Sequence, residues 1–296
     1  MKNILFQGCA TALATPFKEK QIHYSELEKL IKFQIERGIH ALVVNGTTGE
    51  SATLSIEEKK QLIRFTVNLV KHRIPVIAGT GGNNTSEVIE LSQYAESVGV
   101  DGLLIVTPYY NKTTQRGAIY HYRKIANSVH LPILLYNVPS RTGFNLSAES
   151  CYELSKLQNI VGIKEASGNI SQVADIASLC DNNFSIYSGN DDMILPILSL
   201  GGRGIISVLS NIAPNQTISI VNHYFQHNIE TATSLQLKAI PLIRALFSEV
   251  NPIPIKFALN LMGYEFGTPR LPLIELSKQK QEDLEEQMNK YGLLIS

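Results

Sequence analysis

The sequence predicts an α/β protein, a (β/α)8 barrel (TIM barrel) with a C-terminal helical appendage. One observation is a set of eight short apolar runs without the alternation of half-buried strands, as expected of parallel strands covered on both faces. The other is that longer amphipathic segments separate these runs, so strand and helix alternate. The expected strands are residues 10–14, 41–44, 75–78, 103–106, 133–136, 160–164, 185–187 and 204–207. An open, doubly wound sheet is the alternative with the same alternation.

The segments between the strands have apolar residues at helical spacing. In residues 25–37, Leu27, Leu30 and Ile31 fall on one face, and residues 147–157 open with Ser147 as an N-cap. Helices are likewise expected at residues 57–71 and 86–98.

Beyond residue 230 only helical patterns remain, at residues 231–250, 255–262 and 278–291. The turn signal Asn251-Pro252-Ile253-Pro254 separates the first two, because proline cannot continue a helix. We therefore expect a catalytic barrel at residues 1–230 and a helical domain at 231–296 that packs on it.

Composition indicates a protein that acts on small molecules. Its 26 basic and 26 acidic residues give a formal net charge of zero, so neither nucleic acid nor an anionic membrane is an expected partner. The three cysteines (Cys9, Cys151 and Cys180) cannot form a disulfide framework in 296 residues, which fits a reducing cytoplasm. No apolar run reaches the roughly 18 residues of a membrane span, and we expect no signal peptide.

Lys164 ends the expected strand at residues 160–164 and is followed by the small residues 166–168. In (β/α)8 barrels the reacting groups lie at the C-terminal ends of strands and in the loops that follow. A lysine shielded from water there favours the neutral amine, which can attack a carbonyl and form a Schiff base. A surface lysine at a strand end is the ordinary alternative.

The loops after other strands add groups that bind anions. Thr47 and Thr48 lie between two glycines, which let the backbone approach an anionic ligand. Arg141 is the only arginine in these loops, and its guanidinium can bind a carboxylate through two hydrogen bonds. Near the ends of the last two strands, Gly189 and Ile206 offer mainly backbone groups.

Phenol groups stand at two neighbouring strand ends. Tyr109 and Tyr110 follow the fourth strand, and Tyr136 ends the fifth. A phenol near a reacting carbonyl is a candidate proton carrier, although a single tyrosine is more often a wall residue of the pocket.

Two other chemistries are weakly indicated. His223 and His227 stand four apart on a helix, but no glutamate lies between them and no third ligand is evident, so they do not indicate a zinc site. Asp191 and Asp192 precede an apolar run and are interpreted as the start of a helix, where negative charge is favourable. Both pairs are left out of the candidate site.

Taken together, five motifs resemble the 4-hydroxy-tetrahydrodipicolinate synthase (dihydrodipicolinate synthase) family over essentially the whole chain. They are Gly46-Thr47-Thr48-Gly49-Glu50, Pro108-Tyr109-Tyr110-Asn111, Tyr136-Asn137-Val138-Pro139-Ser140-Arg141-Thr142-Gly143, Gly162-Ile163-Lys164-Glu165-Ala166 and Asn251-Pro252-Ile253-Pro254-Ile255-Lys256. The resemblance implies a (β/α)8 barrel, a homotetramer, and a lyase that condenses pyruvate with L-aspartate 4-semialdehyde on the route to diaminopimelate and lysine. It implies no cofactor or metal, because a protonated imine is the electron sink.

The resemblance also implies roles for the candidate residues. Lys164 forms the imine with pyruvate, Tyr136 exchanges protons, and Thr47 and Tyr110 complete a hydroxyl relay. Tyr110 is expected to enter the site of a neighbouring subunit.

Substrate positioning is implied for four further residues. Thr48 and the backbone near Gly189 and Ile206 are expected to hold pyruvate, and Arg141 the carboxylate of the semialdehyde.

Lysine inhibits some members of this family, which implies a possible effector site. The matching positions are Ser51, Ala52, Ile56, Lys59, Asn83, Glu87 and Tyr109. Ile56 and Lys59 depart from the inhibited pattern, which has histidines there. Because the charge of Lys59 would repel a cationic ligand, we expect weak inhibition or none.

Two alternative functions share the scaffold. One is a pyruvate aldolase similar to N-acetylneuraminate lyase, against which Arg141 and the Thr47-Thr48 pair argue, because a short substrate needs a near, fixed cation. The other is a barrel that only binds or regulates. Lys164, Tyr136, Tyr110 and Thr47 together argue against it.

Overall fold

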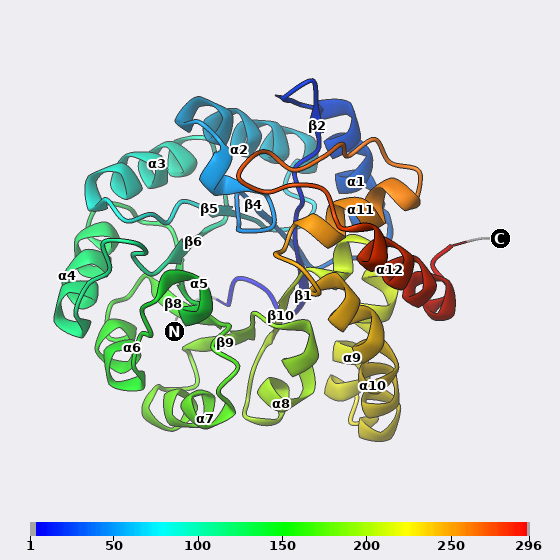
Figure 1. The fold of residues 1–296 in the computed structure, drawn as a ribbon. Coiled ribbons are helices and arrows are strands. Elements are labelled where there is room, and N and C mark those ends of the chain that lie inside the picture. Colours follow the sequence, from blue (N-terminus) through cyan, green and yellow to red (C-terminus); the bar gives the residue numbers. More distant parts are fainter. Residues whose placement is uncertain (1–3, 295–296) are drawn as a thin grey trace.

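The chain folds into a closed barrel of eight parallel strands surrounded by helices (Figure 1), as a computed structural model that describes residues 4–294 shows. The remaining ends of the two expected domains, residues 1–3 and 295–296, lie outside this range. The barrel strands are β1 (Gly8–Ala12), β4 (Ala41–Val44), β5 (Val76–Gly79), β6 (Gly102–Val106), β7 (Ile133–Asn137), β8 (Ile160–Glu165), β9 (Ser185–Ser188) and β10 (Gly204–Ser207). β1 pairs with both β4 and β10, which closes the ring and rules out the open sheet.

The strands agree with the sequence prediction to within two residues at each end. The largest shift is in β1, which the sequence placed at residues 10–14. Leu13 and Ala14 are buried although they lie beyond the end of β1, so the apolar run in the sequence extends past the hydrogen-bonded strand. A short antiparallel pair, β2 (Phe17–Lys18) and β3 (Gln21–Ile22), was missed because two residues are too few to show a pattern.

The helices fall between the strands and after the last one. Their bounds are α1 (Tyr24–Glu36), α2 (Ile56–Val70), α3 (Thr85–Ser97), α4 (Gln115–Ala126), α5 (Pro139–Thr142), α6 (Ala148–Ser155), α7 (Ile170–Leu179), α8 (Ile194–Ser199), α9 (Pro214–Phe225), α10 (Ile229–Leu246), α11 (Ile253–Leu261) and α12 (Lys278–Tyr291). α10 ends four residues earlier than expected, because the N–H of Ser248 bonds three residues back to Ala245 and tightens the last turn.

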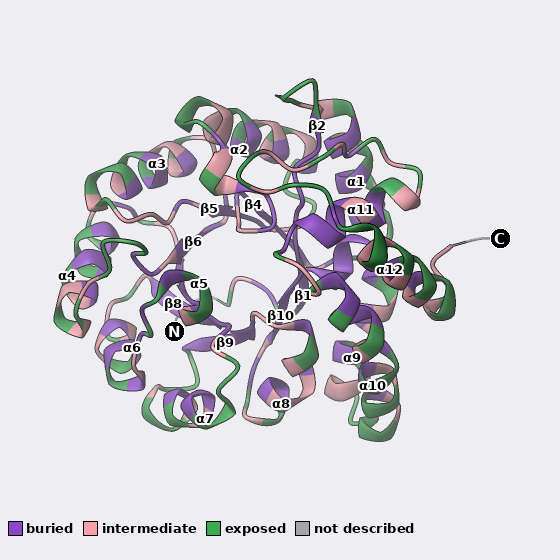
Figure 2. Ribbon diagram, viewed as in Figure 1, coloured by how far each residue is buried: buried purple, intermediate pink, exposed green. Residues whose placement is uncertain are grey.

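The core has two layers (Figure 2). One lies between the strands and the helices and extends without a break into the C-terminal helices, where Leu242, Leu284 and Met288 are buried. The other fills the barrel interior and includes Tyr136, Tyr187 and Ile206. The residues that face the axis of the barrel therefore include two of the predicted site.

Candidate active site

Lys164 projects from β8 into the barrel. It is aligned with Tyr136 on β7 and with Tyr187 on β9, and both of these belong to the interior cluster. Only 6% of Lys164 is exposed, and its Nζ lies 4.4 Å from the centroid of the Tyr136 ring. The structure therefore places the predicted nucleophile in a shielded position beside a phenol ring, with the cation over its face.

Gly189 lies against the stem of this lysine. A Cβ at Gly189 would be 3.1 Å from Cε of Lys164 and 2.6 Å from Cβ of Ala166, so no larger residue fits without displacement. Ile206 is fully buried on β10, within the same interior cluster as Tyr136. Gly189 therefore lies against the nucleophile and Ile206 belongs to the barrel interior, while their role in holding pyruvate stays a prediction.

Asp191, which the sequence analysis left out of the site as a helix start, is a buried carboxylate near Lys164. It does begin a turn of 3-10 helix, Asp191–Met193, but its carboxylate is only 2% exposed and does not face the solvent. It accepts hydrogen bonds from the hydroxyl of Ser207 and from the N–H groups of Val208 and Leu209. Burial raises the pKa of this carboxyl, while these hydrogen bonds and the positive charge of Lys164 act in the opposite direction. Asp191 is therefore a buried anion near the nucleophile that fixes the loop after β10.

The loop after β4 presents the two threonines on a tight turn. The N–H of Gly49 donates to the carbonyl of Gly46, and the N–H of Glu50 donates to that of Thr47. The side chain of Thr48 is 2% exposed, and its Oγ1 accepts a hydrogen bond of 3.1 Å from Nδ2 of Asn251.

Asn251 joins two predicted substrate-binding residues. In addition to its bond to Thr48, its carbonyl oxygen accepts a hydrogen bond of 3.1 Å from Nη2 of Arg141 on α5. Its own Oδ1 is buried and has no partner among the described residues. The sequence analysis placed Asn251 in a turn and in one of the five motifs but gave it no role in the site, because nothing local predicts contacts to residues more than 100 positions away.

A cavity of about 270 Å³ lies beside these loops. Thr47, Arg141 and Asn251 line it, whereas Lys164 and Tyr136 do not. It is also lined by four of the predicted effector residues, namely Ser51, Ala52, Lys59 and Tyr109.

The other three predicted effector residues are Asn83, Glu87 and Ile56, which do not line this cavity. Asn83 and Glu87 line a neighbouring cavity of about 830 Å³, and Ile56 is exposed at the start of α2. Burial lowers the pKa of Lys59, and the carboxylate of Glu87 partly offsets this. The cation of Lys59 is therefore electrostatically coupled to Glu87.

Tyr110 is separated from the other hydroxyls of the proposed relay. It is 91% exposed and has a positive φ of 64°, so its ring packs against almost nothing in its own chain. The ring of Tyr110 is therefore open to solvent in this chain, and its place in the relay stays a prediction.

Two further observations bear on the class of protein. Residues 4–294 contain no helix that is long and apolar enough to span a membrane. Over the same range, no cluster of three or more His, Cys, Asp or Glu side chains is arranged to hold a metal ion, and His223 and His227 belong to none.

Fold and site together define a class of barrel enzymes in which a shielded lysine at a strand end forms a Schiff base with a carbonyl substrate. Comparison with known proteins gives the family. The model of the dihydrodipicolinate synthetase family matches residues 5–291, and the chain belongs to this family.

Curated sequences and solved structures agree with this assignment. The chain is 51% identical over 291 residues to the 4-hydroxy-tetrahydrodipicolinate synthase of a Thermoanaerobacter species, with 98% of both chains covered. The crystal structure of dihydrodipicolinate synthase from Thermotoga maritima superposes with a TM-score of 0.97 at 43% identity, covering 98% of this chain and 100% of the other. A dihydrodipicolinate synthase from Cyanidioschyzon merolae with lysine bound has a TM-score of 0.96 at 41% identity, covering 99% and 100%.

Proposed function

We propose that this protein condenses pyruvate with L-aspartate 4-semialdehyde to 4-hydroxy-tetrahydrodipicolinate, in the biosynthesis of diaminopimelate and lysine. The observation that carries the proposal is Lys164, which is 6% exposed at the end of β8 and faces Tyr136 in a member of the dihydrodipicolinate synthetase family.

The chemistry begins at the amine of Lys164. The amine attacks the keto carbon of pyruvate, and loss of water gives an imine. The protonated imine withdraws electrons, so a methyl proton leaves and an enamine forms. The enamine carbon then bonds to the aldehyde carbon of the semialdehyde, whose oxygen takes up a proton, and the imine to Lys164 forms again. The amino group of the semialdehyde part attacks this imine carbon, which closes the ring, breaks the bond to Nζ of Lys164 and releases 4-hydroxy-tetrahydrodipicolinate and the free amine. Tyr136 is the proposed donor and acceptor of these protons, with Thr47 and the Tyr110 of a second subunit completing the relay.

Substrate binding is assigned to four residues, of which Arg141 lines the cavity. Thr48 and the backbone at Gly189 and Ile206 position pyruvate, and Arg141 binds the carboxylate of the semialdehyde. The bonds from Thr48 and Arg141 to Asn251 support this assignment, because they hold the two side chains in a fixed relation.

The assembly and location of the protein form part of the proposal. We propose a homotetramer built as a dimer of dimers, supported by the exposure of Tyr110, whose ring has a role only in a second subunit. A cytoplasmic location is supported by Cys9 and Cys151, which are buried thiols. We also propose that residues 1–230 are the catalytic barrel and residues 231–296 the helical domain.

The proposal is tested by the substrate preference of the purified protein. Pyruvate is combined either with aspartate 4-semialdehyde or with N-acetylmannosamine, and consumption of pyruvate is measured for the natural protein and for Lys164→Ala. We expect turnover only with the semialdehyde and only in the natural protein. Turnover with the amino sugar alone would assign the protein to the sialic-acid lyases instead, and undiminished activity in Lys164→Ala would remove the mechanism.

A further inference from the structure

The C-terminal segment reaches into the loop that presents the two threonines. We propose that Glu50, Lys256 and Arg270 are positioning residues by which this segment fixes the Thr47-Thr48 turn for catalysis, an inference that rests on the function proposed above.

Glu50 is the centre of this contact. Nζ of Lys256 on α11 donates a hydrogen bond of 2.8 Å to Oε1 of Glu50, and the backbone N–H of Arg270 donates one of 2.9 Å to Oε2. The side chains of Lys256 and Glu50 are each 1% exposed. Lys256 also donates to the carbonyl of Thr268 at 3.1 Å. Both carboxylate oxygens are thus held by groups more than 200 residues away in the sequence.

The backbone carries this restraint to the threonines. The N–H of Glu50 donates a hydrogen bond of 3.0 Å to the carbonyl of Thr47. Glu50 has a φ of 57°, a left-handed conformation that costs a residue with a Cβ about 1–2 kcal/mol. Such a conformation persists only where the surroundings impose it, and here the two bonds to its carboxylate do so. The preceding residue, Gly49, is held as well, because its carbonyl accepts a bond of 2.8 Å from the hydroxyl of Thr15.

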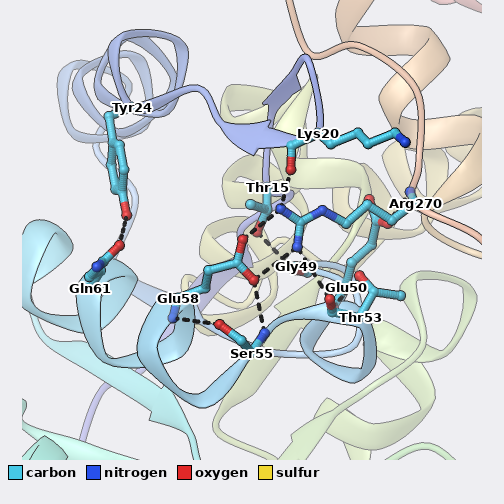
Figure 3. Close-up of polar contacts among 10 residues, drawn as sticks. All are labelled: Thr15, Lys20, Tyr24, Gly49, Glu50, Thr53, Ser55, Glu58, Gln61 and Arg270. Carbon is cyan, nitrogen blue, oxygen red and sulfur yellow. Dashed lines mark hydrogen bonds and ion pairs between the residues drawn. The ribbon is translucent and has the colours of Figure 1, made fainter.

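Arg270 extends the same restraint to the start of α2 (Figure 3). Its guanidinium donates two hydrogen bonds to the carboxylate of Glu58, at 2.9 and 2.6 Å, and one of 3.2 Å to the carbonyl of Thr53. Glu58 in turn closes a capping box with Ser55. Arg270 therefore holds the stretch between the threonine turn and the first turn of α2 at Glu50, Thr53 and Glu58, beside the contact of Lys256 with Glu50.

The cluster contributes more to the geometry of the threonine turn than to the stability of the fold. Removing two charges from water is costly, and replacing a buried ion pair with well-packed hydrophobic residues of similar volume is often neutral for stability. The threonine hydroxyls, by contrast, have to be held within a fraction of an ångström of their working positions. A cluster that adds little stability while fixing a strained turn beside the cavity fits a role in positioning.

The test compares single variants with the double variant. Lys256→Met and Glu50→Gln each leave a buried polar group without its partner, and Lys256→Met/Glu50→Gln removes both charges. Lys18→Met/Glu265→Gln is the matched control, because it removes an exposed ion pair of the same region. For each protein we measure kcat, the melting temperature and the yield of a pyruvate adduct trapped with borohydride.

We expect the double variant to melt close to the natural protein and to trap pyruvate, yet to have a kcat reduced at least tenfold. The control should be unchanged in all three. A double variant whose kcat recovers together with its melting temperature would show that the cluster is only structural and would overturn the inference. If the double variant does not fold, the kcat of Glu50→Gln tests the inference, because this variant keeps the size of the side chain and one oxygen acceptor. An undiminished kcat in Glu50→Gln overturns the inference. Absence of an adduct in the natural protein would instead refute the proposed function.

Discussion

The positive charge of Lys59 leads to a specific prediction about inhibition of the enzyme by free lysine. Lys59 is partly buried, and its cation is electrostatically coupled to Glu87, the carboxylate best placed to hold the ammonium group of a bound lysine. A lysine ligand would therefore have to compete with Lys59 for Glu87 and would also be repelled by it. We predict that lysine inhibits the natural protein weakly, and that Lys59→His increases its sensitivity.

The magnitude follows from Coulomb's law. Two like charges about 5 Å apart repel each other by about 0.8–1.7 kcal/mol at a dielectric constant of about 40–80, which is roughly a 4- to 17-fold change in affinity. Near pH 8 a histidine with its ordinary pKa of about 6.5 is neutral, so the substitution removes the repulsion and leaves a group that can form hydrogen bonds. Lys59→Met is the matched control, because it removes the charge without adding such a group.

The assay is the initial rate of condensation against rising lysine concentration. We expect half-inhibition of the natural protein only above the millimolar range, with a shift to roughly 4- to 17-fold lower concentration in Lys59→His and a smaller shift in Lys59→Met. Half-inhibition of the natural protein below the millimolar range would refute the reasoning, and so would two variants that behave like the natural protein.

Three further predictions concern substrate binding, assembly and acid stability. Arg141→Ala should lower kcat/KM for the semialdehyde, because the loss of a charged contact costs about 2–4 kcal/mol of transition-state stabilisation. A change confined to the KM of pyruvate would contradict the assignment. Mixing subunits of Lys164→Ala with those of Tyr110→Phe should restore activity, because the site with an intact lysine then receives an intact tyrosine from the other subunit. If the mixture is no more active than the separate variants, Tyr110 acts in the active site of its own chain. Burial lowers the pKa of His121 to about 4. Between about pH 6.5 and 4 the unfolded chain therefore binds a proton at this histidine that the folded chain does not. Lowering the pH through this range should reduce the free energy of unfolding by up to about 3 kcal/mol. His121→Gln should lack that part of the loss in urea unfolding at fixed protein concentration, and equal acid sensitivity would refute it.

Much of the fold could be predicted because its signals are local. A strand such as β4 is apolar on both faces, and a helix such as α2 begins with a serine and a glutamate three residues apart, so a short window contains the information. The β2–β3 pair escaped because each strand has two residues. The end of α10 was misplaced because apolar residues continue past its last turn.

The site was predictable where a motif stands at a strand end and unpredictable where it depends on distant residues. Lys164 and Tyr136 lie side by side because β7 and β8 are adjacent, which the order of the strands in the sequence already indicates. The contacts of Asn251 with Thr48 and of Lys256 with Glu50 depend instead on how the C-terminal helices pack. The burial of Asp191 near Lys164 was not predictable, because a carboxylate at a helix start is usually exposed and its contacts with residues 207–209 depend on how the strands pack.

The central claim is that the amine of Lys164 forms an imine with pyruvate. The most direct measurement is reduction with borohydride in the presence of pyruvate, followed by mass spectrometry of the peptides, with Lys164→Ala as the control. The account predicts one pyruvate-derived adduct per chain, on the peptide that contains Lys164, and none in the variant. An adduct on another lysine, or none in a protein that still condenses its substrates, would contradict it.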